Sequence, residues 1–371
     1  MKLKTLVMKP NTLVMRLGTL VMLTIALCVF ATERLLPQVE GQAQTAANKF
    51  TEREVTFAGA GGLELLGTLT LPAGRAGKVP GVLLLPGSGP SDRNGNQPPQ
   101  LVTDLLKQIA ERLAADGYAS LCFDKRATRG YLSSWPKEVA ALNDFFSWDN
   151  FVGDARAGLV FLQTQPEINS KQTVIAGHSE GAMIAMQIAH DLEGKANAPA
   201  GLILLSSPGR TLGTVLTEQV YAGLKRGGVT GDAAKPYEDY LPRAIDQIIK
   251  DGTVPPNPPQ GLAGIFPPSA LKLLQIELAF DPAKVLSAYT GPVLVIQGGK
   301  DIQISAAREF PLLQSGLKQR KRGTYKALVV PSASHNLKRV ENENVEPGFA
   351  GPVVPQALDN ISEWLGQALR R

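Results

Sequence analysis

Cysteine and histidine are scarce in this sequence. Its 371 residues include 2 cysteines and 3 histidines, and the histidines lie far apart. A zinc-type site needs several such side chains at close spacing, so we expect no metal. Cys122 is the only cysteine beyond the N-terminal segment, which excludes an intramolecular disulfide framework there. The apolar run around it, "YASLCFD", predicts a small buried side chain instead.

A strong excess of one charge is also missing once the N-terminal segment is set aside. The formal net charge is +5, but residues 1–43 hold five basic and two acidic side chains, which leaves +2 for the remaining chain. Binding to a polyanion requires a much stronger basic excess, so we expect no nucleic-acid partner. The hydrophobic fraction of 44% and the charged fraction of 19% are typical of a globular protein.

The N-terminal segment resembles an export signal. Its early charges are positive, and the uncharged apolar run at 17–31 is short for a membrane span. Small-x-small cleavage sites end at Ala31 and Ala43. We therefore predict that residues 1–43 are a signal peptide or an N-terminal anchor. Cleavage gives a secreted or periplasmic protein, whereas an uncleaved anchor is the alternative and the one expected route to a membrane.

Strand and helix patterns alternate along most of the remaining chain, which favours a mostly parallel sheet with helices on both faces. In residues 210–290 this alternation stops, and helical patterns follow one another around a Pro-rich stretch. We predict a core of residues 50–209 and 291–371 and a helical cap inserted at 210–290. An independent domain on a linker is the alternative for this insertion. One helix, at 151–165, has Asp149 or Asn150 as its candidate N-cap.

The stretch "TVIAGHSEGAMIAMQ" combines a buried strand, a sharp turn and a helix around Ser179. Two glycines, Gly177 and Gly181, relieve crowding in such a turn, and the start of the helix favours negative charge at the serine hydroxyl. A G-x-S-x-G match alone is weak, but its position between a strand and a helix makes it specific. We predict that Ser179 is a nucleophile; a helix N-cap serine is the alternative.

A nucleophilic serine needs a base, and the base needs an orienting carboxylate. His335 follows the last strand pattern and is the natural base, since His178 lies in the turn itself and His190 falls within a helix. Asp301 follows the preceding strand pattern, which gives the chain order serine, aspartate, histidine. Asp281 and Asp359 are the alternatives, but both lie in helical sequence.

Two backbone N–H groups are expected to stabilise the oxyanion. One is the amide of Glu180, directly after the nucleophile. The other is the amide of Ser88 in the Gly-rich loop "LLLPGSGPSDRNGN". An ordinary Gly/Pro turn is the alternative for that loop. We also expect Phe266, from the cap, to contact substrate as part of an acyl pocket that excludes water.

These motifs resemble those of the α/β-hydrolase superfamily, and most of all its bacterial carboxylesterases related to serine aminopeptidase-like and dienelactone-hydrolase-like members. The stretches that carry the resemblance are "PGSGPSDRNGN", "FDKR", "GHSEG", "GGKD" and the final "SH". The resemblance implies an α/β-hydrolase fold with an eight-stranded sheet, a variable cap and no cofactor. The sequence departs from the pattern at Pro86, where many relatives have histidine, and in "DKRATRGYLSS".

The predicted function is that of a serine carboxylesterase, which cleaves a small-molecule ester through an acyl-enzyme intermediate. The same triad would serve a peptidase or a thioesterase, because it fixes acyl transfer but not the leaving group. A ligand-binding protein that retains the fold without turnover is a further alternative. The residues Asp124, Lys125 and Arg126 either contact substrate or form structural ion pairs. The sequence makes no prediction of oligomeric state.

Overall fold

The computed structural model describes residues 50–74, 76–341 and 349–370. The predicted signal peptide or anchor at 1–43, with both of its cleavage sites, lies outside these residues. Within the described ranges, no helix has both the length and the apolar character that crossing a membrane requires.

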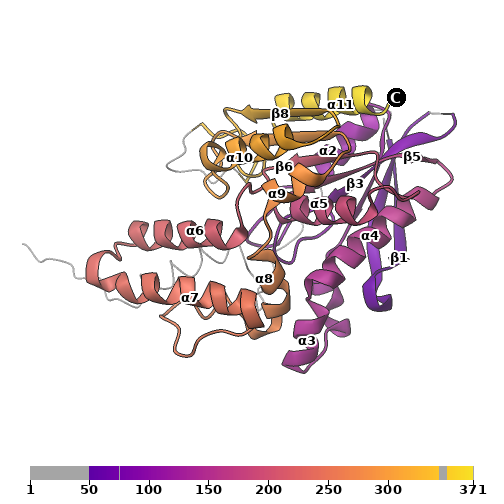
Figure 1. Ribbon diagram of the computed structural model, residues 1–371. Coiled ribbons are helices and arrows are strands. Elements are labelled where there is room, and N and C mark those ends of the chain that lie inside the picture. Colours follow the sequence, from indigo (N-terminus) through magenta and orange to yellow (C-terminus); the bar gives the residue numbers. More distant parts are fainter. Residues whose placement is uncertain (1–49, 75, 342–348, 371) are drawn as a thin grey trace, which may run out of the picture.

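An eight-stranded sheet forms the centre of the molecule, with strand order β1-β2-β4-β3-β5-β6-β7-β8 (Figure 1). The first two strands form an antiparallel hairpin, β2 also pairs antiparallel with β4, and all later pairings are parallel. This is the predicted α/β-hydrolase architecture. The strands are β1 Phe50–Ala58, β2 Glu64–Pro72, β3 Val79–Leu85, β4 Ala119–Phe123, β5 Ile168–His178, β6 Gly201–Leu205, β7 Val293–Gly298 and β8 Tyr325–Val330.

The continuous apolar runs form central strands because helices cover both faces of the sheet. Along β3, Leu83 and Leu85 belong to the hydrophobic cluster on one face, whereas Val82 and Leu84 belong to the cluster on the other. Helices α4, α5, α9 and α10 pack on the first face, and α2 and α11 on the second. Cys122 of β4 is buried, and burial raises the pKa of its thiol. A buried thiol fits the predicted packing role.

Most of the core helices lie where the helical patterns predict them. Helix α4 begins at Trp148 with Ser147 as its N-cap, so the predicted caps Asp149 and Asn150 lie inside its first turn instead. The short helix α3 and the whole of α10 were not predicted. The core helices are α2 Leu105–Ala115, α3 Val139–Phe145, α4 Trp148–Thr164, α5 Glu180–Leu192, α10 Ala306–Gln319 and α11 Pro355–Ala368, with two short 3-10 turns, η1 Ala60–Gly62 and η2 Arg129–Ser134.

Between β6 and β7, residues 210–290 contain helices and no strand within this fully described range; we call them the cap segment. Helices α6 and α7 extend away from the sheet as a pair (Figure 1) and share a hydrophobic cluster with α8. Helix α9 packs on the core instead, through Leu286. The elements are α6 Leu212–Arg226, η3 Gly231–Ala233, α7 Lys235–Asp251, η4 Pro268–Ala270, α8 Leu271–Glu277 and α9 Pro282–Ala288.

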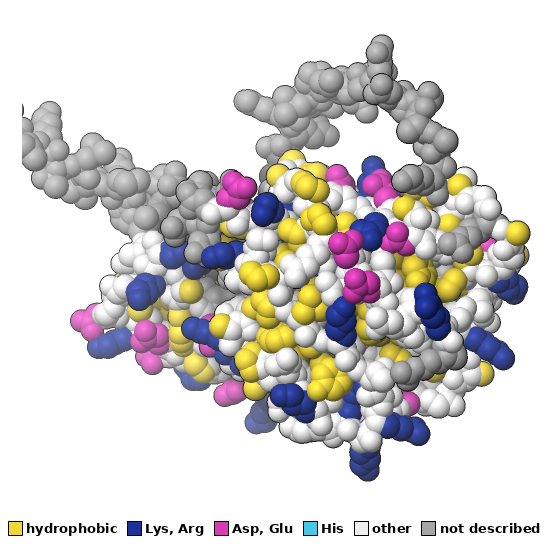
Figure 2. Space-filling model, turned by 90° about the horizontal axis from the view of Figure 1, so that it is seen from above, with side chains coloured by type: hydrophobic (Ala, Val, Ile, Leu, Met, Phe, Trp, Pro, Cys, Tyr) yellow, Lys and Arg dark blue, Asp and Glu magenta, His cyan; other side chains and the backbone are white. Residues whose placement is uncertain are grey.

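Figure 2 looks down on the end of the molecule that carries β8 and α11 in Figure 1. Over the middle of this face, side chains of both charge signs lie among apolar ones. This mixture is typical of the solvated surface of a globular domain.

Candidate active site

Ser179 lies at a sharp turn between the end of β5 and the start of α5. Its backbone has φ 54° and ψ −118°, a conformation that non-glycine residues rarely adopt. A Cβ on Gly177 would lie 2.1 Å from the carbonyl oxygen of Gly181, and one on Gly181 would lie 2.5 Å from that of Leu85. Both glycines are therefore required by close backbone approach, as the motif predicts.

His335 and Asp301 meet at the carboxyl ends of neighbouring strands. The Nδ1 of His335 donates a hydrogen bond to Oδ2 of Asp301 at 2.7 Å. The other carboxylate oxygen, Oδ1, accepts from the backbone amides of Gln303 and Ile304, each at 2.8 Å. Because the carboxylate can only accept, Nδ1 of His335 carries the proton and Nε2 is the nitrogen able to act as a base.

The alternative acids and bases have other positions. Asp281 caps α9 by accepting from the amide of Lys284 at 3.1 Å. Asp359 lies on α11 and forms an ion pair with Arg112 at 2.9 Å. His190 is an exposed residue in the last turn of α5.

His178 supports His335, a role that the sequence analysis missed. It is buried, which lowers its pKa to about 3 and keeps the ring neutral. Its Nε2 lies 2.9 Å from the carbonyl oxygen of His335, and Oγ of Ser206 donates to the same oxygen at 2.8 Å. A carbonyl only accepts, so Nε2 of His178 carries the proton. The backbone of His335 is thus held by two donors from the ends of β5 and β6.

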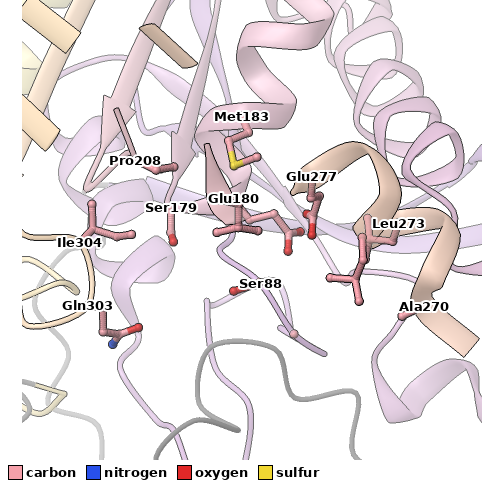
Figure 3. Close-up of a pocket in the computed structure, with 13 residues that line it drawn as sticks. Ser88, Ser179, Glu180, Met183, Pro208, Ala270, Leu273, Glu277, Gln303 and Ile304 are labelled. Atoms are coloured by element: carbon pink, nitrogen blue, oxygen red, sulfur yellow. The ribbon is translucent and has the colours of Figure 1, made fainter. Parts of the chain in front are cut away.

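Ser179 and His335 line one hollow at the carboxyl edge of the sheet, together with polar side chains that include Gln97 and Asn336. The two residues predicted to supply the oxyanion donors, Ser88 and Glu180, lie beside the serine in an adjoining hollow (Figure 3). The structure therefore brings Ser179, His335, Asp301, Ser88 and Glu180 together.

The loop of Ser88 approaches the nucleophile closely. A Cβ on Gly87 would lie 3.3 Å from Cβ of Ser179, and Gly89 has φ +90°. Nε2 of Gln97 donates to the Ser88 carbonyl oxygen at 2.6 Å and so fixes the orientation of the following peptide. Glu180 is the first residue of α5, where backbone amides have no partner within the helix. Both features suit an anion site.

An ion pair joins this loop to the nucleophile turn. Lys125 follows β4, and its Nζ contacts Oε1 of Glu180 at 2.5 Å and the carbonyl oxygen of Gly87 at 3.2 Å. Both side chains of the pair are almost fully buried. The neighbouring residues Asp124 and Arg126 form their own ion pairs, with Arg93 and Asp154. Two features of the sequence could have indicated this ion pair. They are the position of Lys125 directly after a buried strand pattern and that of Glu180 inside the nucleophile turn.

Beyond Ser179, the adjoining hollow is mostly apolar. Its walls come from α5, from the loops after β6 and β7, and from the cap segment; they include Met183, Pro208, Leu212, Ala270, Leu273, Leu274, Glu277 and Ile304. Phe266, expected in this wall, lies elsewhere. It is 3% exposed within the hydrophobic cluster shared by α6, α7 and α8, because its large ring fills the interior of the cap segment. Leu273 and Leu274 of α8 form the wall instead.

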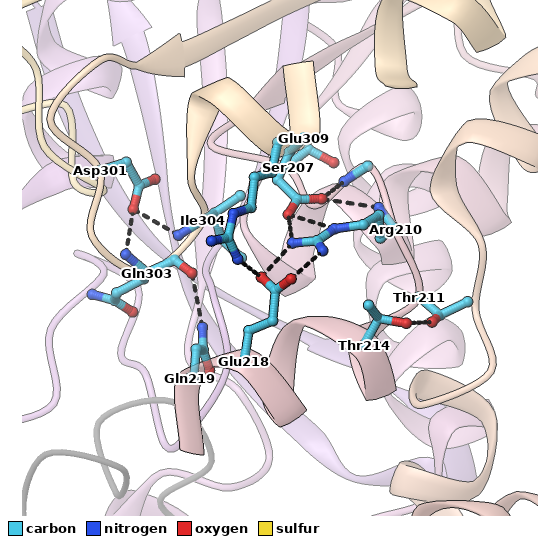
Figure 4. Close-up of polar contacts among 12 residues, drawn as sticks. Ser207, Arg210, Thr211, Thr214, Glu218, Gln219, Asp301, Gln303, Ile304 and Glu309 are labelled. Carbon is cyan, nitrogen blue, oxygen red and sulfur yellow. Dashed lines mark hydrogen bonds and ion pairs between the residues drawn. The ribbon is translucent and has the colours of Figure 1, made fainter. Parts of the chain in front are cut away.

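A polar network ties the acid loop to α6 (Figure 4). Gln219 of α6 donates to the carbonyl oxygen of Gln303 at 2.9 Å, and the Gln303 amide bonds to Asp301. Nearby, Arg210 forms ion pairs with both Glu218 of α6 and the buried Glu309 of α10. The position of Asp301 is thereby linked to the first helix of the cap segment. Among the described residues, no group of acidic, histidine or cysteine side chains could hold a metal ion.

A family model described as "Alpha/beta hydrolase family" matches residues 82–340 of the chain. The chain belongs to this family. Among curated relatives of the hydrolase, the esterase EstD of Thermotoga maritima is 26% identical over 320 residues, which cover 85% of the present chain and 68% of EstD.

Solved structures share the fold of this hydrolase at low sequence identity. An esterase of Pyrococcus furiosus, Pf2001, is 15% identical with a TM-score of 0.51, over 90% of this chain and 97% of that one. A bacterial heroin esterase is 14% identical with a TM-score of 0.52, over 89% of this chain and 87% of that one. These likenesses establish the architecture alone.

Proposed function

We propose that this hydrolase is a serine carboxylesterase that cleaves small-molecule esters through an acyl-enzyme on Ser179. The observation that carries the proposal is the hydrogen bond of 2.7 Å between His335 and Asp301 beside a strained serine turn. Membership of the α/β-hydrolase family and the similarity to EstD support the same reaction class.

In the proposed first step, Nε2 of His335 takes the proton of the Ser179 hydroxyl as its oxygen attacks the ester carbonyl carbon. The negative charge on the former carbonyl oxygen is stabilised by the amides of Ser88 and Glu180. Collapse of this intermediate breaks the bond to the alcohol oxygen, which receives the proton from His335. Asp301 holds the imidazolium in orientation throughout.

In the proposed second step, water hydrolyses the acyl-enzyme. His335 takes a proton from the water molecule as it attacks the acyl carbon, and the proton returns to Ser179 when the acid leaves. Since His335 must reach the leaving alcohol, that portion of the ester belongs in the polar hollow that His335 lines. The acyl chain then belongs in the apolar hollow on the other side of Ser179, which the cap segment helps to enclose.

The proposal is tested with Ser179→Ala and the matched control Ser170→Ala, an exposed serine early in β5. We expect kcat on a nitrophenyl ester to fall by a factor on the order of 10⁴ to 10⁶ in the first variant and to be unchanged in the second. A serine-reactive phosphonate should label wild type at Ser179. A Ser179→Ala variant with a tenth of the wild-type rate would contradict the mechanism.

Parallel assays with amide and thioester substrates of the same acyl group test the leaving group. We expect the ester to give the highest kcat/KM. A higher value for the amide would instead identify a peptidase, and a higher value for the thioester a thioesterase. Binding without any turnover would overturn the assignment as an enzyme.

A further inference from the structure

Three amide side chains line the polar hollow beside His335. They belong to Gln97, Gln303 and Asn336, and the proposed chemical steps use none of them. Among the described residues that line this hollow, none is a lysine, arginine, aspartate or glutamate, and Leu101 has the one large apolar side chain. The hollow therefore presents mainly neutral hydrogen-bonding groups to whatever enters it.

Asn336 is the most deeply placed of the three amides, at 5% exposed. Its backbone amide donates to Oγ of Ser334 at 3.2 Å, but its side-chain amide has no hydrogen-bond partner in the described parts of the chain. Neither Oδ1 nor Nδ2 is among the fully buried polar atoms without a partner, so both keep some accessible surface. Because Asn336 lines the hollow, this open donor and acceptor face its interior.

Gln303 has a fixed backbone and an unpaired side chain. Its amide donates to Asp301, and its carbonyl oxygen accepts from Gln219 of α6. Its side-chain amide has no partner within the described ranges, and the residue lines both hollows. In the view of Figure 3, Gln303 and the apolar wall residue Leu273 lie on either side of Ser179. The open amide thus belongs to the side of the serine away from that wall.

Gln97 adds an acceptor whose orientation is determined. Its Nε2 donates to the carbonyl oxygen of Ser88 at 2.6 Å and to Oγ of Ser91 at 2.9 Å. A carbonyl oxygen only accepts, so the nitrogen of the amide must face it and Oε1 must point elsewhere. No described residue donates to Oε1, and this oxygen is not fully buried. The hollow therefore offers one fixed acceptor and two amides that both donate and accept.

The chemistry of these groups selects among alcohols. A hydroxyl group both donates and accepts, so it can pair with either end of an amide. An apolar alcohol would displace water from the three amides without replacing their hydrogen bonds, which costs binding energy. A charged alcohol would lose hydration without meeting an opposite charge. An alcohol with several free hydroxyl groups fits best.

We propose that the polar hollow binds the alcohol portion of the ester as a neutral polyol, a glycerol or sugar unit, and that Asn336, Gln303 and Gln97 recognise its free hydroxyl groups. This inference rests on the proposed function and names its substrate class. The competing role for these amides is to hold the water of the second step. That step follows release of the alcohol, so it does not affect kcat/KM, whereas recognition of the alcohol does.

The first test compares matched butyrate esters on the full-length wild-type protein. The glycerol ester is paired with the propyl ester, and the glucose ester at the primary hydroxyl is paired with the cyclohexylmethyl ester. Each kcat/KM, from acid release at constant pH, is divided by the alkaline hydrolysis rate constant of the same ester, which removes differences in intrinsic reactivity. We expect at least one polyol ester to exceed its apolar match by about tenfold or more.

The two pairs distinguish a glycerol unit from a sugar unit, and a preference in either pair supports the proposal. Equal or lower values for both polyol esters overturn it. A third pair, the choline ester and its neutral carbon isostere, tests the assignment as a neutral site. We expect no preference for the cation, and a choline ester cleaved faster than both polyol esters also overturns the proposal.

The second test follows the ratio of kcat/KM for the preferred polyol ester to that for its apolar match. Asn336→Leu and Gln303→Met remove hydrogen-bonding groups at nearly constant volume, and we expect each to lower the ratio about tenfold. The control Gln319→Met, which removes an exposed amide on α10, should retain the ratio. A wild-type ratio in both hollow variants overturns the proposed recognition.

The outcomes separate this inference from the proposed function. If the phosphonate labels Ser179 and the apolar esters are cleaved, but no polyol ester is preferred, only the substrate class is wrong. If Ser179 is not labelled and no ester is cleaved, the proposed function itself fails. Should Asn336→Leu not fold, because this residue is buried next to His335, Gln303→Met and the wild-type comparison still decide the question.

Discussion

Asp301 divides its two oxygens between different partners, and this division determines what an amide in its place would do. Oδ1 accepts from the amides of Gln303 and Ile304, and Oδ2 accepts from His335. In Asp301→Asn, the amide oxygen would keep the two backbone donors. The NH₂ group would then face Nδ1 of His335 and favour the wrong tautomer of the imidazole.

We therefore expect Asp301→Asn to lower kcat by about 10⁴ with little change in thermal stability. The matched controls are Asp281→Asn and Asp359→Asn, which change the two alternative carboxylates. Steady-state kinetics and thermal melts of all three proteins check the assignment. A larger loss in either folded control would mean that Asp301 is not the acid.

Among single residues, the order of the chain allowed the prediction of Ser179, Asp301 and His335 as one constellation, because each follows a strand of the same sheet. The supporting residues did not follow from the sequence. His178 holds the carbonyl oxygen of His335 across a sequence separation of 157 residues. For Glu277, the only signal in the sequence is its position as the single acidic residue of the apolar stretch "LKLLQIELAF". Such contacts arise from tertiary packing, which a local pattern does not specify.

At the scale of elements, the strands were predicted well because burial on both faces requires long apolar runs. The first half of β5 was missed, since Asn169, Ser170 and Lys171 are partly or fully exposed and read as a loop. Helix α10 was missed too. It contains Pro311, and its packing against α9 is a tertiary contact. Strand pairing and helix packing stabilise these two elements, so the polar local sequence did not predict them.

Helix α8 shows how the cap segment contributes to the site. Phe266 is buried inside the cap segment, whereas Leu273 faces the hollow. We therefore expect Phe266→Ala to lower the free energy of unfolding by about 3–5 kcal/mol through the cavity it leaves. Denaturant unfolding measures this loss.

The matched change Leu273→Ala should alter the relative kcat/KM of short and long acyl esters more than Phe266→Ala does, because Leu273 lies on the wall itself. Kinetics on a series of acyl chain lengths compare the two variants. If Phe266→Ala altered the chain-length profile more than Leu273→Ala, then Phe266 would belong to the pocket wall after all.

At the scale of the whole molecule, export is proposed from residues 1–43 alone. Three of the five net positive charges lie in this segment, as expected of a signal sequence. We expect the mature protein to begin near Thr32 or Gln44 and to be recovered outside the cytoplasm. N-terminal sequencing of the protein from its native host measures this directly. Met1 on membrane-bound material would support the anchor instead.

The stability of the whole molecule should also depend on pH through the buried cluster of Glu277, Glu180 and Lys125. The pKa of Glu277 is raised above its ordinary value of 4.5 by burial and by the charge of Glu180. Above pH 4.5 the unfolded chain loses this proton while the folded protein keeps it. The unfolded state therefore binds fewer protons, and stability falls as pH rises until the folded-state pKa is passed.

Glu277→Gln keeps the shape of the neutral acid and cannot ionise. The free energy of unfolding of this variant should be closest to that of wild type in acid. Above pH 4.5 the variant should become more stable than wild type by about 1.4 kcal/mol per pH unit, until the raised pKa of Glu277 is reached. Denaturant unfolding across this pH range measures the difference. Glu363→Gln, at an exposed position on α11, controls for the loss of a carboxyl group as such. A difference between Glu277→Gln and wild type that stays constant with pH would show that Glu277 is ionised when buried, and that Lys125 then balances two carboxylates rather than one.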